Sequence, residues 1–165
     1  EMGGIRLSLG TGEWDGVRAV RCEGQRIDLP AGYRQLWLLA SSATGEIDTS
    51  LWIDDDELGL RVPSWTGWIA ERPGAKRWLG LVPGRAGRLT RDELAWVGTH
   101  RHRAGADGGV EDEPYVFCYI FRYAVDLPPD ASTLRLPAGG GLRLFAATLT
   151  DDATPRCRAA RILYG

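Results

Sequence analysis

The segment between residues 114 and 128 constrains the fold of this chain more than any other. Its sequence, PYVFCYIFRYAVDLP, puts an aromatic side chain at every second position. These positions are Tyr115, Phe117, Tyr119, Phe121 and Tyr123. Because successive side chains of a strand point to opposite faces, the five rings share one face. Five rings on one face cannot all face water, so the pattern predicts a long strand at the centre of a packed layer.

The other patterned segments are short and are typical of strands. Residues 5–9 alternate strictly, and residues 35–41 form a continuous apolar run that indicates a strand buried on both faces. Further strands are predicted at residues 26–29, 50–54, 58–62, 93–100, 132–137 and 141–149. A single short helix is predicted at residues 156–163, with Thr154 as its N-cap and Pro155 as its first residue.

Glycine and proline separate these segments. The chain has 22 glycines and nine prolines in 165 residues, and no segment carries the apolar period of a three-turn amphipathic helix. Short strands between such turns predict an all-β domain, an antiparallel, jelly-roll-like (galactose-binding-like) β-sandwich. A DLP turn precedes an apolar strand at both Asp28 and Asp126, which fits hairpins in matching positions of two sheets. The length favours one domain over residues 1–165.

Charge and composition exclude several classes of protein. Twenty basic and 22 acidic side chains leave a net charge of -2, which is not the footprint of a nucleic-acid-binding protein. No apolar run approaches the roughly 20 residues of a membrane span, so no membrane partner is expected. The first residues lack the apolar stretch of a signal peptide, and the compartment stays open. The three cysteines lack the spacing of a zinc knuckle; Cys118 is expected to be buried, and pairing of Cys22 with Cys157 stays open.

The two histidines, His100 and His102, lie in the segment WVGTHRH. On a strand, both rings point to one face, the spacing used by metal-binding jelly rolls such as cupins. Those sites expect a glutamate four or five positions later, whereas the first acid here is Asp107. Glu111 or Glu113 would serve as a ligand only if the loop folded back. A histidine pair hydrogen-bonded to neighbouring carboxylates is therefore favoured over a metal site.

The acidic run at residues 54–57 is expected at the tip of a hairpin. Asp54 and Asp56 are weak candidates for a structural calcium, because this cation takes six to eight oxygen ligands. The run lacks the residue order of a dedicated calcium loop. Solvated hairpin acids are therefore the favoured interpretation, and no cofactor is expected.

Aromatic side chains are the strongest candidates for a binding surface. Among the seven tryptophans, Trp37 and Trp96 lie in apolar strands and are predicted to be core. Trp65, Trp68 and Trp78 lie in the turn-rich segment PSWTGWIAERPGAKRW. Exposed indoles beside charged groups can stack on the apolar face of a sugar. The alternative is that the three rings only pack the loops at the end of the sandwich.

The order of several segments resembles a known family. These segments are GQRIDLPAGYRQLWLLASS, VPSWTGWI, ELAWVGTHRHRAG and EPYVFCYIFRYAVDLPPDASTLRLPAGGGLRLFAATLTDD. Together they resemble the C-terminal β-rich region of bacterial α-mannosidase-like proteins of glycoside hydrolase family 38. The resemblance covers roughly residues 15–153, and W-x-G-T-H-R-H and E-P-Y are its most specific parts. It implies an accessory β-sandwich of a carbohydrate-active protein, whose catalytic domain lies N-terminal to this region.

We therefore expect a non-catalytic, carbohydrate-associated module that binds glycan or supports a glycoside hydrolase domain. No catalytic residues are expected, since a G-x-S-x-G motif and a Cys–His arrangement are both missing. The expected partners are carbohydrates, mannosides among them, and the N-terminal catalytic domain. The residues expected to bind glycan are Trp65, Trp68, Trp78, His100, Arg101, His102 and Glu113. The alternatives are a purely structural or interaction sandwich with an apolar patch for a partner, and a metal-dependent jelly-roll enzyme that uses His100 and His102.

Overall fold

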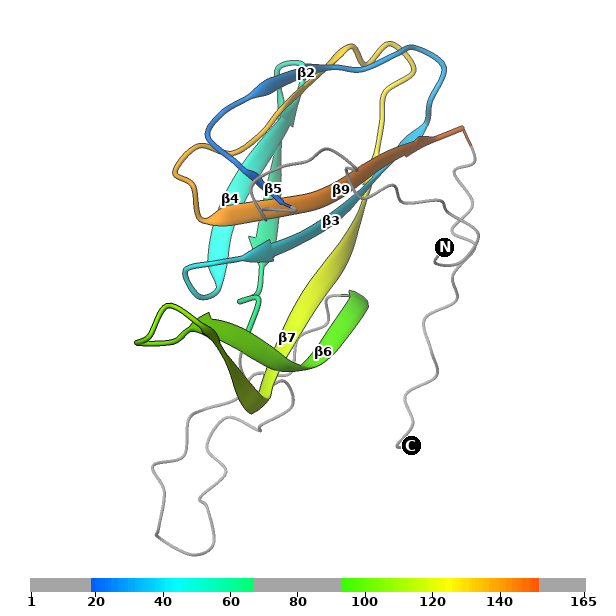
Figure 1. Cartoon of the computed structure of the whole chain (residues 1–165). Coiled ribbons are helices and arrows are strands. Elements are labelled where there is room, and N and C mark those ends of the chain that lie inside the picture. The colour runs from blue at the N-terminus through cyan, green and yellow to red at the C-terminus, as the bar shows by residue number, and fades with distance from the viewer. Residues whose placement is uncertain (1–18, 67–92, 152–165) are drawn as a thin grey trace, which may run out of the picture.

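The computed structural model describes residues 19–66 and 93–151, which hold nine strands and no helix. The strands are β1 (Val20–Arg21), β2 (Arg26–Asp28), β3 (Gln35–Ser42), β4 (Ile47–Ile53), β5 (Asp56–Val62), β6 (Glu93–Ala104), β7 (Val110–Asp126), β8 (Thr133–Arg135) and β9 (Leu142–Thr150). They form a five-stranded sheet in the order β1-β9-β3-β7-β6 and a four-stranded sheet in the order β2-β8-β4-β5 (Figure 1). The predicted all-β antiparallel sandwich is confirmed.

The pairing of the strands is nested along the chain. β1 pairs with β9, β2 with β8, β3 with β7 and β4 with β5, all antiparallel. Such nesting describes one long antiparallel hairpin folded over into two sheets, which is the strand order of a jelly roll. β6 is an addition to this pattern, because it pairs with β7 at the end of the five-stranded sheet.

The core lies between the two sheets. It takes Leu36, Leu38 and Ala40 from β3 and Leu51 and Ile53 from β4, all with at most 2% of their surface exposed. All eight residues of β3 are buried, so both of its faces are covered, as its continuous apolar run predicts. β3 lies between β9 and β7, which explains why its sequence lacks the alternation of a half-buried strand.

The two DLP turns lie at matching corners of the sandwich. The amide of Leu29 donates to the carbonyl of Ser132 at 2.7 Å, and the amide of Leu127 donates to the carbonyl of Arg34 at 2.8 Å. Each turn is thus hydrogen-bonded to the segment that follows the other turn. The repeated sequence therefore corresponds to a reciprocal pair of corners.

The β4–β5 hairpin has a tighter turn than the sequence indicates. Asp54 and Asp55 alone form the turn, and Asp56 pairs with Ile53 as the first residue of β5. Asp54 has a φ of 51°, a left-handed conformation that aspartate tolerates better than most residues. Its carboxylate accepts hydrogen bonds from the Ser132 hydroxyl at 2.7 Å and the Thr133 amide at 2.9 Å, which hold the turn against the start of β8.

Cys22 and Cys118 are free, buried thiols. The strand predicted at residues 5–9, the helix predicted at residues 156–163, and Cys157 lie outside the described residues. Within residues 19–66 and 93–151, no helix is long and apolar enough to cross a membrane.

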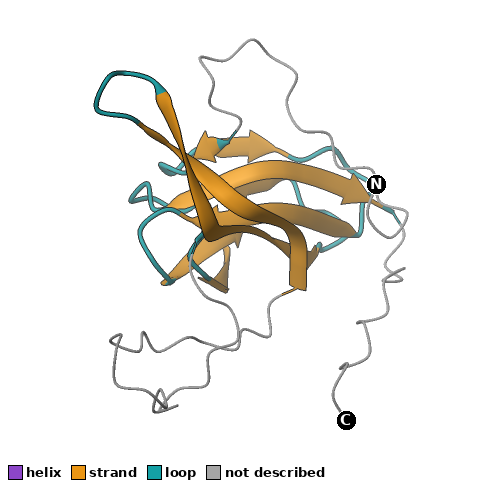
Figure 2. Cartoon of the chain, turned by 60° about the horizontal axis from the view of Figure 1, so that its bottom comes forward, coloured by secondary structure: helices purple, strands orange, loops and turns teal. Residues whose placement is uncertain are grey.

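β7 extends beyond the sandwich. Its first half pairs with β6 but no longer with β3. The pairing of β3 with β7 reaches only to Ala40 and Phe121. Beyond that point Trp65 fills the position beside β7: its amide donates to the Ser42 carbonyl at 2.8 Å, and its carbonyl accepts from the Tyr119 amide at 2.7 Å. Residues 100–114, which we call the arm, form the two-stranded continuation that projects from the sandwich (Figure 2).

Candidate functional site

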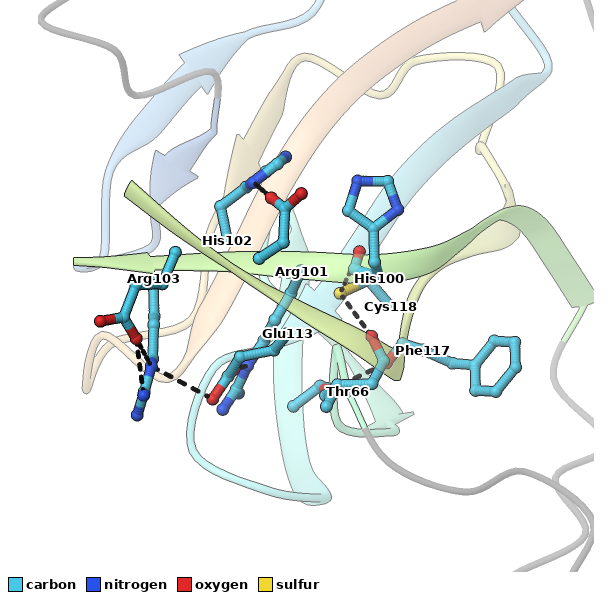
Figure 3. Close-up of polar contacts among 11 residues, drawn as sticks. Thr66, His100, Arg101, His102, Arg103, Glu113, Phe117 and Cys118 are labelled. Atoms are coloured by element: carbon cyan, nitrogen blue, oxygen red, sulfur yellow. Dashed lines mark hydrogen bonds and ion pairs between the residues drawn. The ribbon is translucent and has the colours of Figure 1, made fainter. Parts of the chain in front are cut away.

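The pleat of the arm sorts its charged side chains onto two faces. In the ladder, Arg101 lies opposite Glu113, His102 opposite Asp112, and Arg103 opposite Glu111. Directly opposed residues share a face, and neighbours along a strand alternate. One face, the arginine face, therefore carries Arg101, Arg103, Glu111 and Glu113. The other, the histidine face, carries His100, His102 and Asp112; Figure 3 shows the labelled histidines and arginines on opposite sides of the ribbon.

Ion pairs run along the arginine face. Arg101 pairs with Glu113, and Arg103 pairs with Glu111 at 2.6 Å and with Glu113 at 3.7 Å. The hydrogen bond from Arg101 is the main reason why the pKa of Glu113 lies below its usual value. The guanidinium of Arg101 also lies over the ring of Trp65, 5.8 Å from its centroid. The face thus combines a half-buried indole with an ordered row of opposite charges.

The histidine face brings three potential metal ligands together. Nδ1 of His102 lies 2.5 Å from Oδ1 of Asp112, and the rings of His100 and His102 are perpendicular with centroids 5.0 Å apart. One ligand atom from each of the three residues lies within 4.8 Å of the other two. The contact between His102 and Asp112 is the histidine–carboxylate pairing that the sequence favours. Asp112 itself did not stand out in the sequence, because its place opposite His102 depends on the register of the hairpin.

The residues expected to bind glycan do not form one surface. Trp65, Arg101 and Glu113 lie together, whereas His100 and His102 point to the other face of the arm. Trp68 and Trp78 lie outside the described residues.

Trp96 is the functional candidate that the sequence interpretation missed. It was predicted to be core, and that prediction is wrong: half of its surface (50%) is exposed. The reason is its place in β6, which pairs with β7 on one side and with no described strand on the other. Gly98 lies beneath the indole, since a Cβ there would come within 2.5 Å of the ring carbon Cη2. A glycine two positions after a strand tryptophan is the signal that could have indicated this arrangement.

Two more apolar side chains are exposed beside Trp96. Leu94 is 46% exposed and Val97 is 47% exposed. Leu94 lies opposite Phe121, whereas Trp96 lies opposite Ile120, so the two side chains belong to opposite faces of the sheet. We call Leu94, Trp96 and Val97 the β6 edge patch. It is an apolar stretch at the edge of the five-stranded sheet, next to the charged arm.

The calcium candidates occupy different surroundings. The Asp54 carboxylate accepts hydrogen bonds from Ser132 and Thr133, and these bonds are why its pKa is lowered. Asp56 is exposed at the start of β5. Among the described residues, neither belongs to a cluster of three potential ligands of the kind seen at His100, His102 and Asp112.

A comparison with protein families identifies the domain. Residues 1–153 match the AziU2-like beta-sandwich domain. The chain belongs to this family. The description of the AziU2-like family agrees with the two antiparallel sheets and does not name a glycoside hydrolase, so the likeness to α-mannosidases remains an interpretation of the sequence. No curated protein matches the chain.

Proposed function

We propose that this AziU2-like domain is a non-catalytic interaction module that docks a partner protein along β6. The observation that carries the proposal is the β6 edge patch, in which three large apolar side chains, each about half exposed, lie within four consecutive residues. Single exposed apolar residues are common on proteins, but a group of them with polar surroundings is typical of an interaction site. Tryptophan is also among the residues enriched at the centres of interfaces.

The position of the patch favours a partner that adds a strand. Exposed edge strands are usually protected by charges or proline, because their free backbone groups invite pairing. Residues 94–98 of β6 carry no charge and no proline, although the ladder is irregular between Leu94 and Trp96, and these two side chains lie on opposite faces of the sheet. A partner strand laid along β6 would hydrogen-bond to its backbone and contact both side chains. We therefore expect the partner to supply an extended segment with apolar residues on both faces.

Charged residues precede and follow the patch along β6 and would help to orient a partner. Glu93 begins β6 before the patch, and Arg101 and Arg103 follow it in the arm. Charges at the rim of an interface contribute to specificity and association rate more than to affinity. The α-mannosidase resemblance suggests one class of partner, the catalytic domain of a carbohydrate-active protein.

Glycan binding is the second candidate function, favoured by the arginine face. Trp65 lies beneath Arg101, which is paired with Glu113. An indole beside a guanidinium and a carboxylate has the chemistry to stack on a sugar ring and to hydrogen-bond its hydroxyls. Calorimetric titration with mannosides and other oligosaccharides tests this candidate. Heat of binding that disappears in Trp65→Ala supports it, and a flat titration with every sugar rejects it.

A photo-crosslinking residue in place of Trp96 tests the docking proposal in the organism that produces the protein. The same residue in place of Tyr33, an exposed aromatic outside the patch, is the matched control. We expect position 96 to give one discrete crosslinked product that position 33 does not give. The captured protein must then bind the purified wild-type domain. Its affinity for the Trp96→Ala variant must be at least tenfold lower. Equal crosslinking from both positions, or unchanged affinity, would reject the proposal.

A further inference from the structure

We infer that His100, His102 and Asp112 form a binding site for zinc or a similar divalent transition metal. The site lies on the histidine face of the arm, and the inference does not depend on the docking function proposed for β6. Two imidazoles and one carboxylate are ligands that zinc accepts, and three protein ligands leave a fourth position for water or another donor. Calcium fits poorly, because it requires six to eight oxygen atoms and this cluster has a single carboxylate.

The backbone of the hairpin holds the three ligands together. His102 and Asp112 are directly opposed in the β6–β7 ladder, and His100 lies two positions before His102 on the same face. Both strands are hydrogen-bonded to each other on either side of these residues, so their backbones are already fixed before a metal arrives. Ordering the site therefore costs only the freedom of three side chains.

The distances require only small adjustments. Ligand atoms around a tetrahedral zinc ion are about 3.3 Å apart when each bond is about 2.0–2.1 Å. In the structure, one ligand atom from each residue lies within 4.8 Å of the others, and His102 and Asp112 approach to 2.5 Å. All three side chains are exposed. Modest side-chain rotations can therefore bring them to bonding distance.

The neighbouring cations do not oppose a metal ion strongly. Arg101 and Arg103 alternate with the histidines and so lie on the opposite face. Both are neutralised there by ion pairs with Glu113 and Glu111. Asp112 is the carboxylate of the histidine face, where its contact is with His102 and not with an arginine, and its negative charge favours a cation there.

Titration of the untagged 165-residue chain with zinc, monitored by calorimetry, tests the site. We expect about one zinc per chain with a dissociation constant on the order of micromolar, as suits an exposed three-ligand site. Asp112→Asn should weaken binding at least tenfold, and the double variant His100→Ala/His102→Ala should abolish it. Asp130→Asn, which removes an exposed carboxylate away from the arm, is the matched control and should bind like the wild type.

Spectroscopy distinguishes this site from binding by thiols. The chain has only two histidines, so zinc should shift the ring signals of both in nuclear magnetic resonance spectra. Cobalt in place of zinc should show no sulfur-to-metal charge-transfer band. No binding at millimolar zinc, a sulfur band with cobalt, or full binding by a folded double variant would each overturn the inference. Circular dichroism of each variant establishes that it is folded.

Discussion

The indole ring of Trp96 lies against Gly98, so close that a Cβ on residue 98 would come within 2.5 Å of the ring carbon Cη2. Because residue 98 has no side chain, the Trp96 ring can lie along the strand. Half of the surface of Trp96 is nevertheless exposed. The ring therefore lies over the backbone of residue 98, a position that any side chain on residue 98 would oppose. The pair thus links a local feature of the sequence to the binding surface that we propose.

Substitution of Gly98 by alanine should displace the Trp96 ring without unfolding the domain. The added methyl group conflicts with an exposed side chain that can rotate away, so the free energy of unfolding should change by no more than about 1 kcal/mol. Binding of the partner should weaken several-fold. Gly59→Ala in β5 is the control, because a Cβ there meets no atom within 4 Å. Equal partner affinities of the two variants would contradict this role of Gly98.

The ion pair between Arg122 and Glu93 should contribute more to stability than a surface pair. The Arg122 side chain is 5% exposed, pairs with Glu93 and lies over the ring of Trp37 at 4.9 Å. Glu93→Gln would remove the negative charge that Glu93 places against a buried guanidinium and should cost about 1–3 kcal/mol in urea unfolding. Glu46→Gln removes an exposed partner of Arg61 and should cost less than about 1 kcal/mol. Similar losses in both variants would argue against a special role of Arg122.

Asp54 should make the domain sensitive to acid. Hydrogen bonds from Ser132 and Thr133 lower the pKa of its carboxyl group in the folded state. A lowered folded pKa means that the carboxylate stabilises the fold above its unfolded pKa, and that this contribution is lost as pH falls through the folded pKa. Thermal unfolding measured from pH 6 down to pH 2 should therefore show a smaller loss of stability in Asp54→Asn than in the wild type. Parallel pH profiles of the two proteins would contradict this.

Cys22 should have the opposite effect at alkaline pH. Burial raises the pKa of its thiol to about 11. Because the neutral thiol is favoured in the folded state, its contribution is complete below the unfolded pKa, near 9, and is lost as pH rises toward about 11. Urea unfolding at pH 8 and pH 10.5 should therefore show a larger loss of stability in the wild type than in Cys22→Ala. An equal loss in both proteins would exclude this contribution.

The strands and their two-sheet arrangement could be predicted from sequence because the core imposes strong patterns on them. The continuous apolar run at residues 35–41 predicts a strand buried on both faces, and β3 is buried along its whole length. The turns at Asp28 and Asp126 mark two corners that are hydrogen-bonded to each other's neighbouring segments. Apolar periodicity and turn residues report on burial and chain reversal, and these two properties define a sandwich.

The arm and its two faces could not be predicted in the same way. The ladder shifts between Leu94 and Trp96 and again between Gly98 and His100, so the residues that oppose each other do not follow from alternation alone. Asp112 reaches His102 only because of this register. Trp96 has the local sequence of a core residue, but it lies where the described sheet ends. Strand order is a property of the whole fold, and neighbouring residues carry little information about it.

Docking along β6 is tested most directly by calorimetric titration of the crosslinked partner with the wild-type domain, Trp96→Ala and Tyr33→Ala. Both variants remove an exposed aromatic ring, but only Trp96 belongs to the β6 edge patch. If β6 is the docking edge, Trp96→Ala should lose at least tenfold in affinity while Tyr33→Ala binds like the wild type. Unchanged affinity of a folded Trp96→Ala protein, or equal losses in both variants, would contradict docking at this patch.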